Sequence, residues 1–163
     1  MEKHEEVLVS LRQITRAIYL YSKKLNKESG LTSPQLLLMR SIKEMGNVTI
    51  RQLSVHTNMS PATATTILDR LERNGLAKRI RSTTDKRKVH AHLTEKGQQI
   101  LDSAPKLLQE GFINKFQDLE EWEQSLLLSS VQRIANMMNA EHYDAAPLLA
   151  FGNITATEAP IKD

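Results

Sequence analysis

The chain has 163 residues, 40% of them hydrophobic and 25% charged, with a formal net charge of +3, which suits one domain or a small domain with an appended helical part. The absence of cysteine excludes disulfides, thiolate catalysis, thiol redox sensing and cysteine-based zinc sites. No apolar run reaches the roughly 18 residues of a membrane span, and the start has no signal-peptide pattern, so we expect a cytoplasmic protein with no membrane contact.

The first part of the chain is predicted to be helical. From Glu5 to Leu25, apolar residues recur every three or four positions, which indicates an amphipathic helix. Thr32 and Gln35 have the spacing of a capping box, so a second helix should begin there and end at Gly46. A second capping box predicts a short helix over residues 49–57.

The next helix carries the first candidate binding surface. Ser60 is placed to cap it, Pro61 occupies its first turn, and Gly75 is the expected terminator. An apolar stripe should be buried, which leaves an outward face that is small and polar at its start and basic further along. The residues predicted to make contacts from this helix are Ser60, Ala62, Thr63, Thr65, Thr66 and Arg70.

A basic hairpin is predicted after this helix, with strands at residues 76–81 and 89–93 joined by a polar tip. Between Lys78 and Lys88, six cations stand against the single acid Asp85, so this segment has a net charge of +5 and the rest of the chain has −2. Such a stripe is typical of a surface that binds a polyanion, and a solvated charged hairpin is the alternative. The predicted contact residues of the hairpin are Arg79, Arg81, Thr84, Asp85, Lys86, Arg87 and Lys88.

Helix returns in the last third of the chain. Thr94 should cap a helix that begins at about Glu95, and residues 105–119 and 122–138 each carry an apolar stripe at helical spacing. The remaining residues contain Ala, Pro and Thr without periodicity, which predicts a flexible tail. The expected division is an N-terminal helix (1–30), a central domain (31–100), C-terminal helices (101–142) and a tail (143–163).

Two helices joined by a tight turn and followed by a basic hairpin predict a winged helix-turn-helix, in a mainly α fold with a small β wing. An α-helix fits the major groove of DNA, where Arg70 can reach a guanine edge or a phosphate. Arg87 at the hairpin tip can enter the minor groove, where the potential is most negative. The competing interpretation is a winged helix that binds an acidic protein instead of double-stranded DNA.

The motifs in this region resemble those of the MarR family of transcription regulators. The segment from Asp85 to Gly97 is similar to the wing signature of that family, and residues 31–35 and 68–76 also match its pattern. The resemblance implies a homodimer that binds a pseudo-palindromic operator in a sequence-specific way, expected to act as a repressor. It also implies that Asp85 pairs with Arg81 or Arg87 and stiffens the hairpin.

The same resemblance implies that the N- and C-terminal helices intertwine into a dimer interface. Both regions carry apolar stripes that are remote in sequence from the winged core, so a partner chain could cover them. Packing within one chain is the alternative. The residues predicted to dimerise are Leu8, Leu11, Ile14, Ile18, Leu126, Ile134 and Met138.

A small-molecule effector is a further implication, because regulators of this kind usually release DNA when a ligand binds between the dimer helices and the winged domain. Aromatic rings can hold a quaternary ammonium such as a betaine, although rings at helical spacing more often form core. The candidate pocket residues are Tyr19, Tyr21, Phe112, Phe116 and Trp122. Residues 121–133 and 144–147 resemble, more narrowly, the MarR regulators that repress compatible-solute genes for ectoine and glycine betaine under osmotic stress.

Neither an enzyme nor a cofactor is predicted. His90 and His92 lie two residues apart on a strand and so point to one face, which is the geometry of a metal pair. Without cysteine or nearby carboxylates other than Asp85, an ordinary wing surface is the preferred interpretation. The alternative function is a metal- or aromatic-ligand-responsive regulator of other genes. No nucleophile has a positioned base, and no glycine-rich loop could bind phosphates.

Overall fold

The computed structural model describes residues 2–143, so the predicted tail lies, apart from Tyr143, outside the described residues. Within the described range the fold is mainly helical with one small sheet, which confirms the predicted fold class. The elements are α1 (Lys3–Ser29), α2 (Ser33–Met45), β1 (Val48–Thr49), α3 (Ile50–His56), α4 (Pro61–Arg73), β2 (Ala77–Arg81), β3 (Val89–Leu93), α5 (Glu95–Ser103), α6 (Leu108–Gln117), α7 (Glu121–Met137) and a short 3-10 helix (Ala140–His142).

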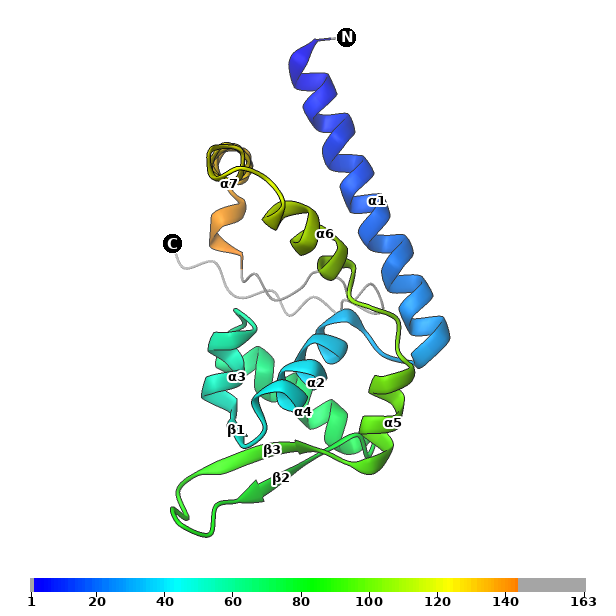
Figure 1. Ribbon diagram of the computed structural model, residues 1–163, viewed down its shortest axis with the longest axis vertical. Helices are drawn as coiled ribbons and strands as arrows, with labels where there is room; N and C mark the ends of the chain where they lie inside the picture. Colours follow the sequence, from blue (N-terminus) through cyan, green and yellow to red (C-terminus); the bar gives the residue numbers. More distant parts are fainter. Residues whose placement is uncertain (1, 144–163) are drawn as a thin grey trace, which may run out of the picture.

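The elements fall into two groups in space. Helices α2 to α5 and the three strands form the winged domain in the lower part of Figure 1. Helix α1 extends upward from this domain, and α6 and α7 lie above it. We call α1, α6 and α7 the arm helices.

The sheet is antiparallel, with strand order β1-β3-β2. In the central strand, Ala91 lies opposite both Val48 of β1 and Arg79 of β2. Strands β2 and β3 agree with the predicted hairpin to within one residue. Strand β1 was not predicted, because two residues are too few to show the alternation that identifies a strand.

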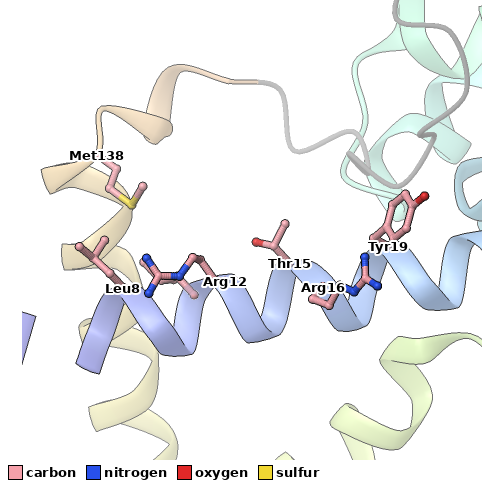
Figure 2. Close-up of a pocket in the computed structure, with 7 residues that line it drawn as sticks. Leu8, Arg12, Thr15, Arg16, Tyr19 and Met138 are labelled. Atoms are coloured by element: carbon pink, nitrogen blue, oxygen red, sulfur yellow. The ribbon is translucent and has the colours of Figure 1, made fainter. Parts of the chain in front are cut away.

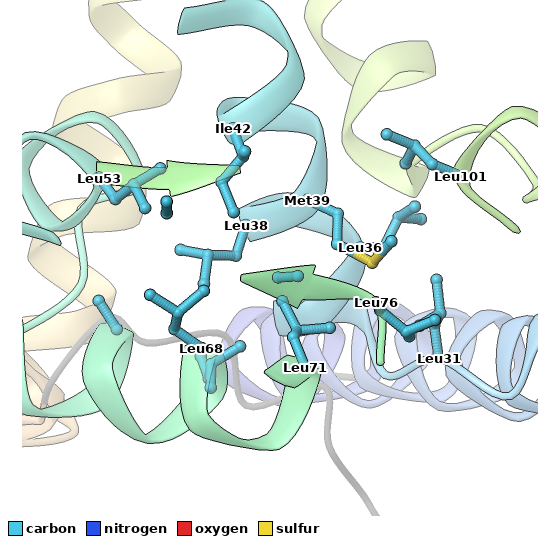
Figure 3. Packing of buried hydrophobic residues seen from close by; sticks show 14 of the residues in the cluster. Leu31, Leu36, Leu38, Met39, Ile42, Leu53, Leu68, Leu71, Leu76 and Leu101 are labelled. Atoms are coloured by element: carbon cyan, nitrogen blue, oxygen red, sulfur yellow. The ribbon is translucent and has the colours of Figure 1, made fainter. Parts of the chain in front are cut away.

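The core of the winged domain is built around α2. Leu38 and Met39 of this helix have no exposed surface, and neither have Leu68 and Leu71 of α4 in the same cluster (Figure 3). Fully burying such a side chain contributes about 1.5–3 kcal/mol. The apolar stripe predicted on α4 is therefore confirmed as core, and the opposite face of α4 is left to solvent.

A tight contact joins the end of the hairpin to α5. Thr94 caps α5 by accepting a hydrogen bond from the Gly97 amide at 3.0 Å, and its hydroxyl donates to the Gly75 carbonyl at 2.6 Å. A Cβ atom at Gly97 would lie only 1.9 Å from the carbonyl oxygen of Leu76, so only glycine fits there. This approach fixes the hairpin against the helix that leads to the arm.

The arm helices differ from the winged domain in what they bury. Helix α7 has no buried residue, and α1 buries only Ser22 and Leu25, at its winged-domain end. Of the predicted dimer residues, Leu8, Ile14, Leu126 and Met138 are exposed, whereas Leu11, Ile18 and Ile134 are partly buried. No helix in the described part of the chain is long and apolar enough to cross a membrane.

Candidate nucleic-acid interface

Helices α3 and α4 form the helix-turn-helix, connected by residues 57–60. Asn58 adopts a positive φ of 53°, and the Met59 amide donates back to the Ser54 carbonyl at 2.9 Å, which closes the turn. Ser60 caps α4 by accepting a hydrogen bond from the Thr63 amide at 3.1 Å. Because Met59 is buried, the turn is anchored to the core and the first turn of α4 is held at the surface.

The outward face of α4 matches the predicted one. Ala62, Thr66 and Arg70 are exposed, and Thr63 and Thr65 are partly exposed. The Thr65 and Thr66 hydroxyls donate to helix carbonyls four residues earlier, at 2.7 and 3.0 Å. They therefore present methyl groups and acceptor lone pairs to a partner, a set that suits thymine methyls and base amino groups in the major groove.

The wing tip is held together by two short side chains. The Ser82 hydroxyl accepts hydrogen bonds from the amides of Thr84 and Asp85, both at 3.2 Å. The Asp85 carboxylate in turn accepts from the Arg87 amide at 3.1 Å and from its Nε at 3.3 Å. Of the two arginines expected to pair with Asp85, Arg87 is therefore the partner.

Arg87 nevertheless projects into solvent. Its side chain is 92% exposed, because Asp85 holds only its inner end. Arg81, Lys86 and Lys88 are exposed as well, and none of them forms an ion pair in the described part of the chain. The tip thus presents several cations that no acid of its own domain neutralises, in an arrangement suited to a polyanion.

Arg79 behaves differently from the other predicted wing residues. It pairs with Glu72 and, at 2.7 Å, with Asp69, both on α4, and its side chain is only 25% exposed. These ion pairs place Arg79 on the face of β2 that turns toward α4, apart from the exposed cations of the wing tip. Arg79 instead ties the wing to the helix whose outward face is the main candidate surface.

The five aromatic side chains proposed for an effector pocket do not come together. Phe112 and Phe116 lie with ring centroids 5.4 Å apart, Trp122 is largely exposed, and the Tyr21 hydroxyl donates to the Lys106 carbonyl at 2.8 Å. Tyr19 lines a cavity, and its ring is covered by the Arg16 guanidinium at 5.5 Å. Sequence spacing placed these rings on the correct helices but could not show which faces converge.

That cavity lies between α1 and the residues that follow α7 (Figure 2). It encloses about 480 Å³, and its walls are mainly apolar, with Leu8 and Leu11 on one helix and Met138 on the other side. Arg12 and Arg16 add two positive charges. The walls therefore suit an apolar molecule with an anionic group better than a quaternary ammonium.

The junction between the winged domain and the arm contains residues that the sequence did not single out. Arg40 of α2 pairs with Glu110 of α6, and its Nη2 donates to the Pro105 carbonyl at 3.2 Å. Burial raises the pKa of the nearby Tyr21 phenol above its usual value of 10.0, with Arg40 acting in the opposite sense, so the phenol keeps its proton. A lone arginine in an apolar helix was the only sequence signal for this contact.

His90 and His92 share the outer face of β3, as their spacing required. No group of three or more His, Asp or Glu side chains in residues 2–143 is placed to hold a metal ion. The two imidazoles instead line a polar cavity under the wing tip.

Comparison with known proteins agrees with this geometry. Residues 31–89 match the MarR family. The chain is 25% identical over 138 residues to the uncharacterized HTH-type transcriptional regulator YsmB of Bacillus subtilis (strain 168), covering 85% of this chain and 94% of that protein. It is 28% identical over 109 residues to the homoprotocatechuate degradative operon repressor of Escherichia coli, covering 67% and 74% of the two chains.

A solved structure of a MepR-like protein complexed with pseudoligands superimposes with a TM-score of 0.60 at 22% identity, covering 85% of this chain and 97% of that one. The fold and the surface define a winged helix-turn-helix protein with a basic wing. Residues 31–89 are similar to the MarR family, and the curated relatives are a transcription regulator and a repressor, so the comparisons support a DNA-binding transcription regulator.

Proposed function

We propose that this protein is a homodimeric repressor that binds a pseudo-palindromic operator through two copies of the winged domain. The proposal is carried by an outward α4 face of small polar side chains and Arg70 beside a wing tip whose Arg87 extends into solvent. The other wing cations, Arg81, Lys86 and Lys88, form no ion pair within residues 2–143. In this arrangement α4 enters the major groove and Arg87 the adjacent minor groove. The repressor role is supported by the name of the E. coli relative.

The arm helices supply the dimer interface in this proposal. Their exposed apolar side chains form a surface that a monomer would leave in water, and a second copy is the natural cover in a two-fold assembly. The proposed division is an N-terminal dimerisation helix (1–30), a DNA-binding domain (31–100) and C-terminal dimerisation helices (101–142). DNA then binds in the cytoplasm to the two winged domains at the far side from the arm.

An effector would act through the arm. We propose that the cavity between α1 and Met138 takes an apolar carboxylate, because its walls are apolar and Arg12 and Arg16 are positive. A betaine is disfavoured there, since Arg16 occupies the Tyr19 ring that would attract it. Isothermal titration with salicylate-like acids, betaine and ectoine, each also tested for release of DNA, would refute the effector if all three classes were silent.

The test of DNA binding is a fluorescence-anisotropy titration. A duplex from the region upstream of the protein's own gene should bind more tightly than random DNA of equal length, with affinity that falls steeply as salt rises. Equal affinity for both duplexes would refute sequence-specific regulation. Absence of binding even at low salt would favour the alternative, a winged helix that binds an acidic protein.

The target genes are proposed from the sequence resemblance alone. Residues 121–133 and 144–147 are similar to regulators of ectoine and glycine betaine genes, and residues 144–147 lie outside the described residues. We therefore propose that neighbouring compatible-solute genes are repressed at low osmolarity. Transcript levels of the adjacent genes in a deletion strain, with and without added salt, test this role independently of DNA binding in vitro.

A further inference from the structure

The polar cavity under the wing tip lies on the side of the sheet opposite to the core. It encloses about 520 Å³ between β2, β3, the tip and the residue before β1. The lining residues that matter for its chemistry are Asn47, Arg81, Ser82, Lys88, His90 and His92. We call it the wing cavity.

The strand register fixes which way the wing cavity faces. Directly opposed residues share a face, so His90 lies beside Ile80 and His92 beside Lys78. Arg79 and Ala91 point to the other face, where Arg79 pairs with α4 and Ala91 is buried. Figure 1 shows the helices on that inner side of the sheet, so the wing cavity is turned away from α4.

The cavity is lined with groups that donate hydrogen bonds or carry positive charge. Arg81, Lys88, His90 and His92 have no ion-pair or hydrogen-bond partner for their side chains among residues 2–143. The acid that also lines the cavity, Asp85, is already engaged by the amide and Nε of Arg87. Convergent unpaired donors around a space of this size are suited to a phosphate-like oxyanion.

We propose that the wing cavity binds a backbone phosphate of DNA that lies outside the segment contacted by α4, and that His90 and His92 make this contact stronger as the pH falls. The proposal rests on the DNA binding put forward above and extends it to a surface that contacts no base. The regulator would then hold its operator more tightly in acid.

The pH dependence follows from what each form of histidine offers. Phosphate oxygens accept hydrogen bonds, and a neutral imidazole has one donor whereas an imidazolium has two donors and a charge. Phosphate binding and proton uptake by His90 and His92 therefore favour each other. Among the charged groups around the pair, Lys78 of β2 lies directly opposite His92, and Arg81, Lys88 and Asp85 line the same cavity at the tip, Arg81 from a position opposite Val89. Strand β1 contributes only the uncharged Thr49, and the helices lie on the other face.

The experiment compares the wild type with the double variant His90→Gln/His92→Gln. Gln keeps polar hydrogen-bonding capacity but cannot be protonated, and circular dichroism checks that the variant is folded. His56→Gln is the matched control, since His56 is an exposed histidine of the same domain on α3, placed 3.8 Å from Glu44 and outside the lining of the wing cavity. Affinity is measured from about pH 8 to about pH 6, the range that brackets ordinary histidine titration, with the footprinted operator alone and with about ten extra base pairs on each side.

For the extended duplex we expect wild-type affinity to rise about tenfold over this range, the size of one charge-assisted hydrogen bond. The salt slope should steepen by about 0.9 for each added phosphate contact. The double variant should lose both effects while keeping sequence-specific binding at pH 8, and the His56→Gln control should behave like the wild type.

Two results would overturn the proposal. If the double variant binds specifically but has the wild-type pH dependence, the histidines are not the cause, although regulation of DNA stands. If the gain is the same for the short and extended duplexes, and inorganic phosphate alone shifts the His90 and His92 ring signals in NMR spectra, the cavity is a free-anion site and not a DNA contact. If the wild type shows no sequence-specific DNA binding at any pH, the proposed function on which this inference rests is refuted instead.

Discussion

Helices α4 and α7 have similar apolar patterns in the sequence but differ in burial within the chain. Both carry apolar residues at helical spacing, yet Leu68 of α4 is fully buried in its own chain whereas Leu126 of α7 is 57% exposed. Helix α4 packs on α2 and β2 within the winged domain. No residue of α7 is buried in the described part of the chain.

The contrast teaches what an amphipathic pattern can and cannot specify. It identifies the face that must leave water, because burial of apolar area is favourable wherever it occurs. It does not identify the surface that covers this face. The core of the winged domain is closed within one chain, with Leu25 at the end of α1 as part of it, so its stability is intramolecular. The stability of the rest of the arm depends on protein concentration if a second copy covers it.

The largest effect should come from the winged core. Leu68→Ala removes a fully buried side chain and should lower the free energy of unfolding by about 2–5 kcal/mol, because it leaves a cavity in a packed cluster. Urea denaturation followed by circular dichroism measures the loss. Val55→Ala on α3 is the control, since Val55 is 76% exposed and its truncation should change stability by less than about 0.5 kcal/mol. Similar losses for both would contradict a core closed around Leu68.

A charge introduced on the arm helices should change the oligomeric state, whereas loss of side-chain volume in the core should change stability. Leu126→Glu places a carboxylate on the exposed apolar face of α7 and should convert the proposed dimer to monomer while the winged domain stays folded. Analytical ultracentrifugation measures the change. Gln132→Glu adds the same charge on the polar side of α7 and should leave the dimer intact. A Leu126→Glu protein that is still dimeric would show that other surfaces hold the two copies together.

The same contrast explains which parts of the structure were predictable from the sequence. Capping residues such as Thr32, Ser60 and Thr94 act on amides within three positions, so local rules located the ends of the helices. The predicted Asp85–Arg87 contact also spans two residues and was confirmed. The roles of Arg79 and of Arg40 depend on groups that folding brings together, across 70 positions for the Arg40–Glu110 pair, and no local pattern reports such contacts.

Within the winged domain, α4 and the wing should contribute differently to DNA binding. Arg87→Ala should weaken binding to all duplexes and reduce the salt slope by about 0.9, because it removes one phosphate-region contact. Arg70→Ala or Thr66→Ala should instead change sequence preference, with about 1–3 kcal/mol lost at the affected base pair only. Competition assays on operator variants separate the two patterns. Equal losses on every sequence for all three variants would contradict this division, and all three should remain dimeric.

Arg79 provides a smaller test, because its ion pairs with Asp69 and Glu72 predict that it braces the wing against α4. Arg79→Met should cost about 1 kcal/mol of stability and speed amide hydrogen exchange in β2 and β3, since the ties to Asp69 and Glu72 are lost. Its salt slope for DNA should equal that of the wild type. Arg81→Met is the comparison, because exposed Arg81 is expected to contact phosphate and its loss should reduce the slope. A reduced slope for Arg79→Met would restore it as a DNA contact.

The smallest effect should appear where the winged domain passes into the arm. A hydrogen bond from Lys43 at 2.7 Å lowers the pKa of Asp102 on α5 below its ordinary value of 3.8, with a further hydrogen bond from Gln98. Because the folded pKa is the lower one, this stabilisation is complete above about pH 4 and is lost as the pH falls through the folded value. Asp102→Asn should therefore be slightly less stable than the wild type at neutral pH and equally stable at about pH 2. Thermal unfolding across this pH range measures the difference in stability between Asp102→Asn and the wild type. The control Asp118→Asn alters an exposed carboxylate on the arm, and its difference from the wild type should not shrink in this way. A gap that stays constant down to pH 2 would mean that the Lys43 contact does not couple α2 to α5 in solution.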